Sequence, residues 1–452
     1  MKNIFFVSML LGSFLQAQTQ FTIKGNFPQA INKEILINAY TMAGDSLVSK
    51  TTTDASGKFT IYYPSSYVGA AIVSIKDGKS VIVLLNHENF EMQWSSLEDF
   101  KTLAFKNSPE NEAFSNGSTT AQRAESLLSG LNYLKPIYEQ ELPVSLKKVT
   151  WITTEIEAQK KVFSEFLNSL PKTSYAFYYL KLRKLLQNMP ITASKFIARL
   201  PDHENEFNAM NFASENLLHS GLYKELLDGY FLLMESNGAL ENVYVHTNAS
   251  TDAILKSLEK HPELKQEVAE YMFRLFEKRS LFQAAEHLAL KMLNNQNCEM
   301  DSKHEALFEQ YRKMAKGKTA VDIVLENATQ IVAKVSDIKS KYRLVVFGAS
   351  WCSKCQEELP KLKPYYESWK TKYDLEIVFI SLDTELAKYN TFVKDFPWLS
   401  SCELKGWESK AVVDYCVFGT PTMYLLNQNN TILIKPISEK QIQAWLEMEE
   451  KS

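Results

Sequence analysis

The spacing of apolar residues changes twice along this chain, and those changes limit the folds that it can adopt. Between residues 21 and 94, short runs such as Phe21–Lys24 and Ile35–Tyr40 alternate apolar and polar residues, the pattern of a strand with one buried face. Apolar residues then recur at helical spacing to about residue 318, after which strands alternate with helices. Because 452 residues also exceed what one hydrophobic core can hold, we expect a multidomain protein with three successive architectures.

The first architecture is expected to be an antiparallel β-sandwich over residues 18–108. Turn residues separate its strand-like runs, and in the turn Asp54–Gly57 the glycine can take a positive φ. This part of the sequence has no acidic pair, metal-ligand cluster or nucleophile. His87 stands alone there and is expected to be a surface residue.

The second architecture is expected to be an α-helical domain over residues 109–318. A polar stretch at 107–118 marks its beginning, and prolines interrupt it. Helical spacing is clearest in Ile152, Ile156, Phe163, Phe166, Leu167 and Leu170, and in Leu264, Val268, Tyr271, Met272, Leu275 and Phe276. The aromatic cluster Tyr175–Tyr179 suits either a binding groove or a packed core, and core packing is the preferred interpretation.

The amino-terminal 17 residues have the features of a signal peptide. Lys2 precedes the apolar run Ile4–Leu15, and the small residue Ala17 follows at a suitable cleavage position. We therefore expect residues 1–17 to be removed on export and the mature protein to be soluble and periplasmic. No cysteine follows the run, so a lipoprotein anchor is not expected.

The third architecture, over residues 319–452, is predicted to be an α/β domain. Its strands are expected at Leu344–Phe347, Ile377–Ile380, Met423–Leu426 and Thr431–Ile434. With the intervening helical segments the order is β-α-β-α-β-β-α. This order implies a mixed sheet that is covered by helices.

Two cysteines lie where the first of these strands gives way to a helix. Cys352 would sit at the helix amino terminus, where free backbone N–H groups and the helix dipole stabilise a thiolate. Cys355, one turn further on, would be less exposed and close enough to attack a mixed disulfide. The spacing therefore predicts Cys352 as the redox nucleophile and Cys355 as the resolving thiol.

Further residues around this pair match one family. They are Trp351-Cys-Ser-Lys-Cys355, then Glu358 and Pro360, and much later Gly419-Thr-Pro421. Over residues 319–452 the sequence resembles the extracytoplasmic TlpA/ResA-type branch of the thioredoxin family. A bare CxxC would be weak support, whereas this combination is specific. The order of domains also resembles the exported multidomain oxidoreductases that are common in Bacteroidetes, although that likeness is less specific.

The resemblance implies roles for several residues beside the cysteines. Pro421 should follow a cis peptide bond and shape the site, and Thr420 should offer its backbone to an extended substrate. Trp351, by its position directly before Cys352, should shield one side of the dithiol, and it is a candidate substrate contact. The expected partners are disulfide-containing exported proteins and a membrane electron donor, and no cofactor or metal is expected.

One departure from cytoplasmic thioredoxins concerns proton transfer. Those proteins have a buried aspartate six residues before the first cysteine, where this chain has Val346. In the resembling branch, the glutamate that matches Glu358 lies near the dithiol. Glu358 is therefore the candidate acid–base residue, although its spacing also suits a solvated position on the helix surface.

Four other functions fit this sequence less well than redox catalysis. A CxxC pair is half of a four-cysteine zinc site, but no second half is present. A binding or assembly module without activity would not need both Cys352 and Cys355 together with Pro421. A thiol peroxidase would carry a different approach to its cysteine, and a Cys-His hydrolase would need a histidine, which residues 319–452 lack.

The remaining cysteines leave alternatives open. Cys402 and Cys416 can form a second disulfide or remain as separate buried thiols, because their distance is unknown from sequence. Cys298 is then the odd cysteine and is expected to be buried and inert.

The charge of the chain argues against one class of partner. The direction of electron flow is a separate question, which the sequence leaves open. A formal net charge of −3 and a pI near 6.2 give no electrostatic reason to expect nucleic-acid binding. Reductase, oxidase and isomerase activities all remain compatible with the dithiol. The β-domain and the helical region are expected to select substrates or to form a homodimer.

Overall fold

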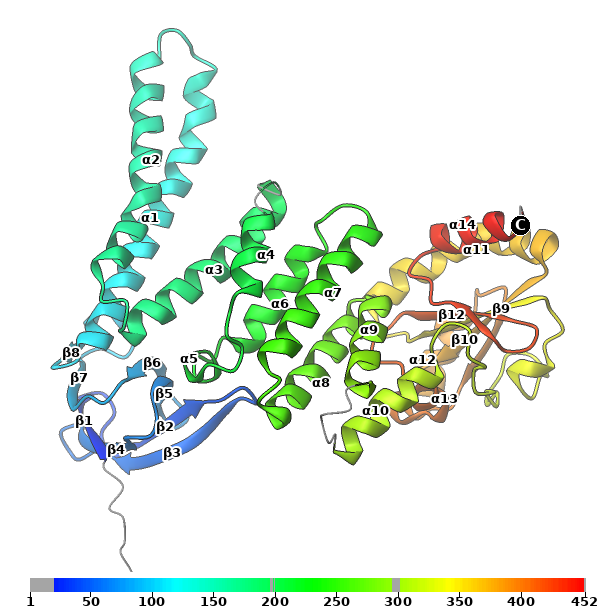
Figure 1. Cartoon of the computed structure of the whole chain (residues 1–452), viewed down its shortest axis with the longest axis horizontal. Coiled ribbons are helices and arrows are strands. Elements are labelled where there is room, and N and C mark those ends of the chain that lie inside the picture. Colours follow the sequence, from blue (N-terminus) through cyan, green and yellow to red (C-terminus); the bar gives the residue numbers. More distant parts are fainter. Residues whose placement is uncertain (1–19, 196–197, 199, 295–300, 451–452) are drawn as a thin grey trace, which may run out of the picture. The chain divides into compact units, whose positions relative to one another are not determined.

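A computed structural model gives the fold of the chain (Figure 1). The residues that it describes are 20–195, 198, 200–294 and 301–450. The expected signal peptide, residues 1–17, lies outside the described residues, and so does Cys298.

The chain divides into two compact units. The first consists of residues 1–196 and 211–230, and the second of residues 197–210 and 231–452. Helix α6, Tyr223–Met234, contains the boundary between them. None of the helices in the described part of the chain is both long and apolar enough to cross a bilayer.

The first unit contains two four-stranded sheets around a common apolar core. Their strand orders are β4-β1-β7-β8 and β3-β2-β5-β6. The strands are β1 Gln20–Asn26, β2 Glu34–Tyr40, β3 Asp45–Thr52, β4 Lys58–Pro64, β5 Gly69–Ile75, β6 Ser80–Leu85, β7 Phe90–Trp94 and β8 Leu103–Lys106. Neighbouring strands are antiparallel, as predicted, except that β1 and β7 run parallel.

The alternation in sequence is what places residues inside and outside this sandwich. In β4, Phe59, Ile61 and Tyr63 are buried while the residues between them are exposed. The turn before β4 has the predicted chemistry, because Gly57 has a φ of +78° and the Asp54 carboxylate accepts hydrogen bonds from two backbone amides. His87 is exposed.

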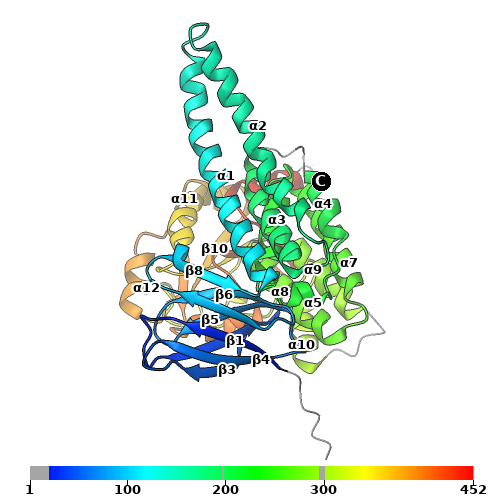
Figure 2. The same ribbon diagram turned by 90° about the vertical axis from the view of Figure 1, so that its left-hand side faces the viewer.

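Helices complete the first unit. They are α1 Pro109–Glu139, α2 Leu146–Ser169, α3 Tyr175–Lys195 and α5 Glu215–Leu218. The side chain of Asn111 in α1 bonds to both the N–H and the C=O of Leu84, each at 2.8 Å, and so attaches the helix to β6. Tyr175 and Tyr179 are buried against the same sheet, which confirms that their cluster is core. Figure 2 shows α1 and α2 side by side as a long hairpin that extends away from the sheets.

The second unit begins with a group of helices and ends with a five-stranded sheet. The helices of the first part are α4 Leu200–Asn208, α7 Leu240–Ser257, α8 Pro262–Lys278, α9 Phe282–Leu293 and α10 Ser302–Lys313. The apolar stripe read from the sequence of α8 faces its core, since Val268, Met272 and Phe276 are fully buried.

The sheet has the order β11-β10-β9-β12-β13. Its strands are β9 Tyr342–Gly348, β10 Leu375–Ser381, β11 Leu399–Cys402, β12 Thr422–Asn427 and β13 Ile432–Ile434. Its helices are α11 Ser353–Tyr373, α12 Leu386–Val393, α13 Lys410–Asp414 and α14 Glu439–Glu450. β9, β10 and β11 are parallel, and β12 and β13 are antiparallel, which gives the expected mixed sheet.

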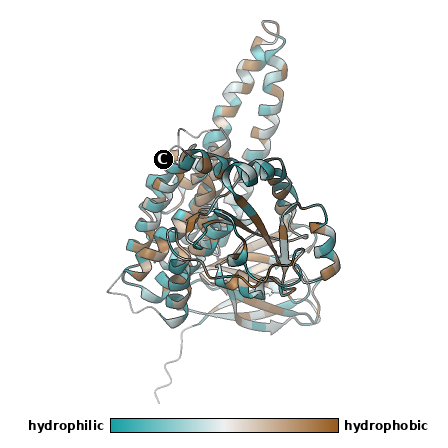
Figure 3. Ribbon diagram, turned by 90° about the vertical axis from the view of Figure 1, so that its right-hand side faces the viewer, coloured by the Kyte–Doolittle hydropathy of each residue, from teal (hydrophilic) through white to brown (hydrophobic). Residues whose placement is uncertain are grey.

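The predicted element order was wrong in one respect, because it omitted β11. This strand is four residues long, and two of them are serines, so neither its length nor its apolar pattern distinguishes it from a loop. Figure 3 shows that the helices of this unit carry both hydrophilic and hydrophobic residues, as helices with one buried face do. All seven residues of β9 are buried, as a central strand covered on both faces requires.

Candidate active site

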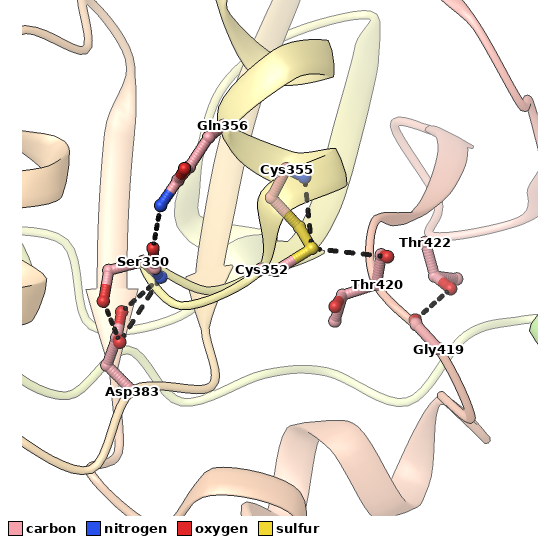
Figure 4. Close-up of a disulfide and its surroundings, with 8 residues drawn as sticks. All are labelled: Ser350, Cys352, Cys355, Gln356, Asp383, Gly419, Thr420 and Thr422. Carbon is pink, nitrogen blue, oxygen red and sulfur yellow. Dashed lines mark hydrogen bonds between the residues drawn. A yellow bond between two sulfur atoms is a disulfide. The ribbon is translucent and has the colours of Figure 1, made fainter.

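The two cysteines lie at the carboxyl end of β9, where the chain turns into α11 (Figure 4). Cys352 is the residue that caps the helix, and it forms a disulfide with Cys355 across a Cα–Cα distance of 5.2 Å. Its Sγ also accepts the backbone N–H of Cys355 at 3.1 Å. Cys352 is 9% exposed and Cys355 is fully buried. An incoming group therefore has access to Cys352 alone.

The electrostatics of this position favour a negatively charged sulfur on Cys352. The first N–H groups of α11 have no partner within the helix, and one of them already points at this sulfur. The partial positive charge of the helix amino terminus adds to this effect. Both favour the thiolate that attacks disulfides, so the geometry suits Cys352 as nucleophile and Cys355 as resolving thiol.

A second segment, immediately before β12, approaches the disulfide. The Thr420–Pro421 peptide bond is cis, as the resemblance implied. The carbonyl oxygen of Thr420 lies 3.5 Å from the Sγ of Cys352, a distance at which the thiol of the reduced form could donate a weak S–H···O hydrogen bond (Figure 4). The structure thus brings Thr420 and Pro421 to the dithiol from 68 residues away in the sequence.

The two other predicted site residues lie at different depths. Trp351 is 54% exposed, and its ring is 6.2 Å from that of Trp407, which is also exposed. Together they form an aromatic surface next to Cys352. Glu358 follows Cys355 by one helical turn, and its half-buried carboxylate pairs with Lys361 at 2.8 Å. No observation tests the acid–base role of Glu358, which stays a prediction.

Sequence reasoning missed the buried carboxylate of Asp383. This residue follows β10 and is 1% exposed. Its oxygens accept the backbone N–H of Ser350 at 3.1 Å, the Ser350 hydroxyl at 2.6 Å and the Ser381 hydroxyl at 2.7 Å. Ser350 is two residues before Cys352, so Asp383 holds the turn that presents the nucleophile (Figure 4). The available signal was an acid directly after a buried parallel strand, at the sheet edge where such folds place their sites.

Gly348 is the last residue of β9, and its lack of a side chain makes room for the buried sulfur. A Cβ at this position would lie 3.2 Å from the Sγ of Cys355 and 2.9 Å from the ring of Phe379. The contact with Phe379 is closer than packed atoms tolerate, and the one with Cys355 is tighter than most Cβ contacts. The glycine is thus required by the approach of α11 to the sheet.

The other two described cysteines do not form a second disulfide. Cys402 and Cys416 are separate, buried thiols. Burial raises the pKa of both, that of Cys416 to about 12, so both stay protonated and unreactive near neutral pH. Within the described residues, no group of three or more His, Cys, Asp or Glu side chains is placed to hold a metal ion.

Comparisons with known proteins agree with this geometry. Residues 340–432 match a family model described as thioredoxin-like. The carboxyl-terminal domain is a thioredoxin-like domain. The chain is 28% identical over 149 residues to a thiol-disulfide oxidoreductase ResA of Bacillus cereus, covering 32% of this chain and 84% of that protein. It is also 40% identical over 78 residues to nucleoredoxin of Xenopus laevis, covering 17% of this chain and 18% of that protein.

Solved structures similar to parts of this chain include two from Bacteroides. A thiol-disulfide oxidoreductase from Bacteroides fragilis NCTC 9343 is 25% identical, with a TM-score of 0.27 over 29% of this chain and 99% of that one. A thioredoxin-like protein from Bacteroides caccae ATCC 43185 is 18% identical, with a TM-score of 0.38 over 56% of this chain and 93% of that one. With the family match, the ResA relatives and the Cys352–Cys355 pair, the chain is a thiol-disulfide oxidoreductase of the thioredoxin-like type.

Proposed function

We propose that this thioredoxin-like protein is exported and reduces or reshuffles disulfides in extracytoplasmic proteins. The observation that carries the proposal is the position of the Cys352–Cys355 disulfide, at a helix amino terminus and opposite the carbonyl of Thr420. The sequence Met1–Ala17, with its basic start and apolar run, supports export. The curated ResA proteins, which are named as thiol-disulfide oxidoreductases, support the reaction class.

In the reductive direction the reaction has two exchange steps. The Cys352 thiolate attacks one sulfur of a substrate disulfide, a mixed disulfide forms, and the other substrate sulfur leaves as a thiolate. Cys355 then loses its proton and attacks the Sγ of Cys352, which releases the second substrate thiol. The enzyme is left as the observed disulfide, and two electrons have passed to the substrate. A membrane electron donor would restore the dithiol.

The other predicted residues have distinct roles in this scheme. Glu358 would accept the proton of Cys355 in the second step, since it lies one turn further along the same helix. The exposed ring of Trp351 would pack on apolar side chains of the substrate beside its disulfide. Thr420 would pair with the substrate backbone, and Pro421, which has no N–H, would hold that backbone in position.

The test is a redox titration of the whole protein. The chain is equilibrated in glutathione buffers, free thiols are trapped, and Cys352→Ala and Cys355→Ala serve as controls. We expect one reversible two-electron transition that both variants lose. A potential near the thioredoxin value of about −270 mV would identify a reductase, and one near the oxidase value of about −120 mV an oxidase or isomerase. Absence of a transition would refute catalysis and leave a binding or assembly role.

A homodimer is also proposed, and the distal half of the α1–α2 hairpin supports it. That half buries three apolar residues between its helices, Leu131, Ile152 and Ile156. It exposes a larger apolar set: Leu127, Tyr133, Leu134, Ile137, Leu142, Val144, Leu146 and Trp151. Lys147 and Glu141 lie beside this set without an ion-pair partner among the described residues, so a second copy can offer each the opposite charge.

Light scattering after size-exclusion chromatography tests this arrangement. We expect the mature wild-type chain to be a dimer and Trp151→Glu to be a monomer, because a charge would enter an apolar interface. Val245→Glu changes an exposed valine in the other unit and should stay dimeric. A monomeric wild-type protein would contradict the proposal.

A further inference from the structure

The segment that carries Thr420 and the cis proline is held from outside the thioredoxin-like domain. Phe418, two residues before Thr420, packs edge-to-face on Phe273 of α8, with ring centroids 5.5 Å apart. The guanidinium of Arg274, the next residue of α8, lies 5.4 Å from the centre of the same Phe418 ring. One ring of this segment is therefore contacted by two side chains of one helix.

The backbone of the segment also reaches α8. A Cβ built on Gly419 would lie 3.5 Å from the Cα of Lys278, the last residue of the helix. That is ordinary van der Waals distance, so the two backbones pass each other closely. We call Phe273, Arg274, Lys278, Phe418 and Gly419 the α8 clamp.

Few hydrogen bonds restrain this segment in addition to the α8 clamp. Within the described part of the chain, the amides of Phe418 and Gly419 make no hydrogen bond. The carbonyl of Gly419 accepts only the Thr422 hydroxyl, at 2.8 Å. Side-chain packing on α8 is thus the main restraint on the segment just before Thr420.

The anchor behind the clamp is well packed. Phe273 is fully buried, and it also packs edge-to-face on Tyr311 and Phe308 of α10, at 4.7 and 5.5 Å. Tyr311 donates a hydrogen bond to the buried carboxylate of Glu277 at 2.5 Å. α8 can therefore transmit a fixed position to Phe418 rather than follow its movements.

We propose that α8 is a positioning element of the redox site, which holds the Thr420 carbonyl beside Cys352 and so lowers the thiolate population of Cys352. The proposal rests on the proposed function of the dithiol. A carbonyl oxygen 3.5 Å from sulfur can accept a hydrogen bond from a thiol but repels a thiolate. The central helices would then tune the reactivity of a cysteine that belongs to another domain.

The test is the pH profile of iodoacetamide alkylation of Cys352 in the reduced, full-length protein, because iodoacetamide reacts with the thiolate. Phe418→Leu and Phe273→Leu each remove the ring pair while nearly conserving volume. We expect either variant to move the profile to lower pH and to raise the alkylation rate below its midpoint about threefold, as the carbonyl moves away. The double variant should do no more than either single one, because both remove the same contact.

Two matched controls separate this effect from a general loss of packing. Phe308→Leu changes a fully buried ring that packs on Phe273 and forms no ring pair with Phe418 among the described residues, so it should leave the profile unchanged. Arg274→Ala should produce a smaller shift in the same direction. Arg312→Ala, which removes an equally exposed and equally paired arginine from α10, should produce none.

A second readout is the reduction of insulin disulfides. A looser segment should raise KM for insulin several-fold and change kcat little, since the substrate backbone meets a less ordered partner. An unchanged alkylation profile in Phe418→Leu and Phe273→Leu would overturn the proposal while the wild-type redox transition still occurs. Loss of that wild-type transition would instead count against the proposed function.

Discussion

Asp383 is the residue whose replacement best tests the architecture under the nucleophile. Its carboxylate accepts two hydrogen bonds from Ser350 and one from the Ser381 hydroxyl. In Asp383→Asn the amide oxygen can keep the bonds from Ser350, while the amide N–H₂ must face Ser381, whose hydroxyl can turn to accept. The variant therefore loses charge rather than partners.

The expected cost follows from that exchange. A hydrogen bond to a charged group contributes about 1.5–3 kcal/mol and a neutral one about 0.5–1.5 kcal/mol, so Asp383→Asn should lower the free energy of unfolding by about 1–3 kcal/mol. Asp383→Ala removes every acceptor and leaves buried donors unpaired, so it should cost about 3–5 kcal/mol. In both variants the turn at Ser350 loosens, and we expect the kcat/KM of insulin reduction to fall several-fold.

Urea unfolding followed by tryptophan fluorescence measures the stability change, because five of the seven tryptophans lie after residue 350. Asp395→Asn is the control, since this aspartate is exposed in the same unit and should change stability by no more than about 0.5 kcal/mol. If Asp383→Asn unfolds at the wild-type urea concentration, the carboxylate does not hold the turn and the reasoning fails.

Three further outcomes follow from the same structure. Gly348→Ala should cost about 1–3 kcal/mol in urea unfolding, because the new methyl group meets the Phe379 ring at 2.9 Å, and an unchanged midpoint would contradict the packing. Burial raises the pKa of the Glu277 carboxyl above its unfolded value near 4.5, so its contribution to stability is complete below that pH and declines above it. As pH rises from 4 to 7, the free energy of unfolding of wild type should therefore fall relative to that of Glu277→Gln. A difference independent of pH would refute this. Cys402 and Cys416 should resist iodoacetamide in the native reduced protein and react once it is unfolded, as mass spectrometry of labelled peptides would detect; rapid native labelling of either would show that its burial is wrong.

Local patterns predicted the parts of this protein that depend on neighbouring residues. The alternation in β4 and the apolar stripe of α8 each identify a buried face from residues that are close together in the sequence. The CxxC pair and the cis proline were found for a related reason, because each belongs to a short motif of specific residue types. β11 was missed because its four residues have no such pattern, and its place comes from pairing with β10.

The contacts of Asp383 and of Phe418, which were not predicted, join distant segments. Asp383 reaches Ser350 across 33 residues, and no periodicity in sequence relates the two. The approach of α8 to Phe418 is of the same kind, since an apolar helix face specifies burial but not the partner that buries it.

The reactivity of Cys352 is controlled by one local and one long-range feature of the fold. The helix amino terminus that stabilises its thiolate is a local feature, which any chain with this motif would have. The carbonyl of Thr420, which opposes the thiolate, is placed by the segment that α8 holds. Transferring residues Trp351–Cys355 into another thioredoxin-like domain should therefore carry over the first influence without the second. The alkylation profile of the recipient should then follow its own proline segment, and a profile that followed the transferred motif alone would mean that α8 has no part in setting reactivity.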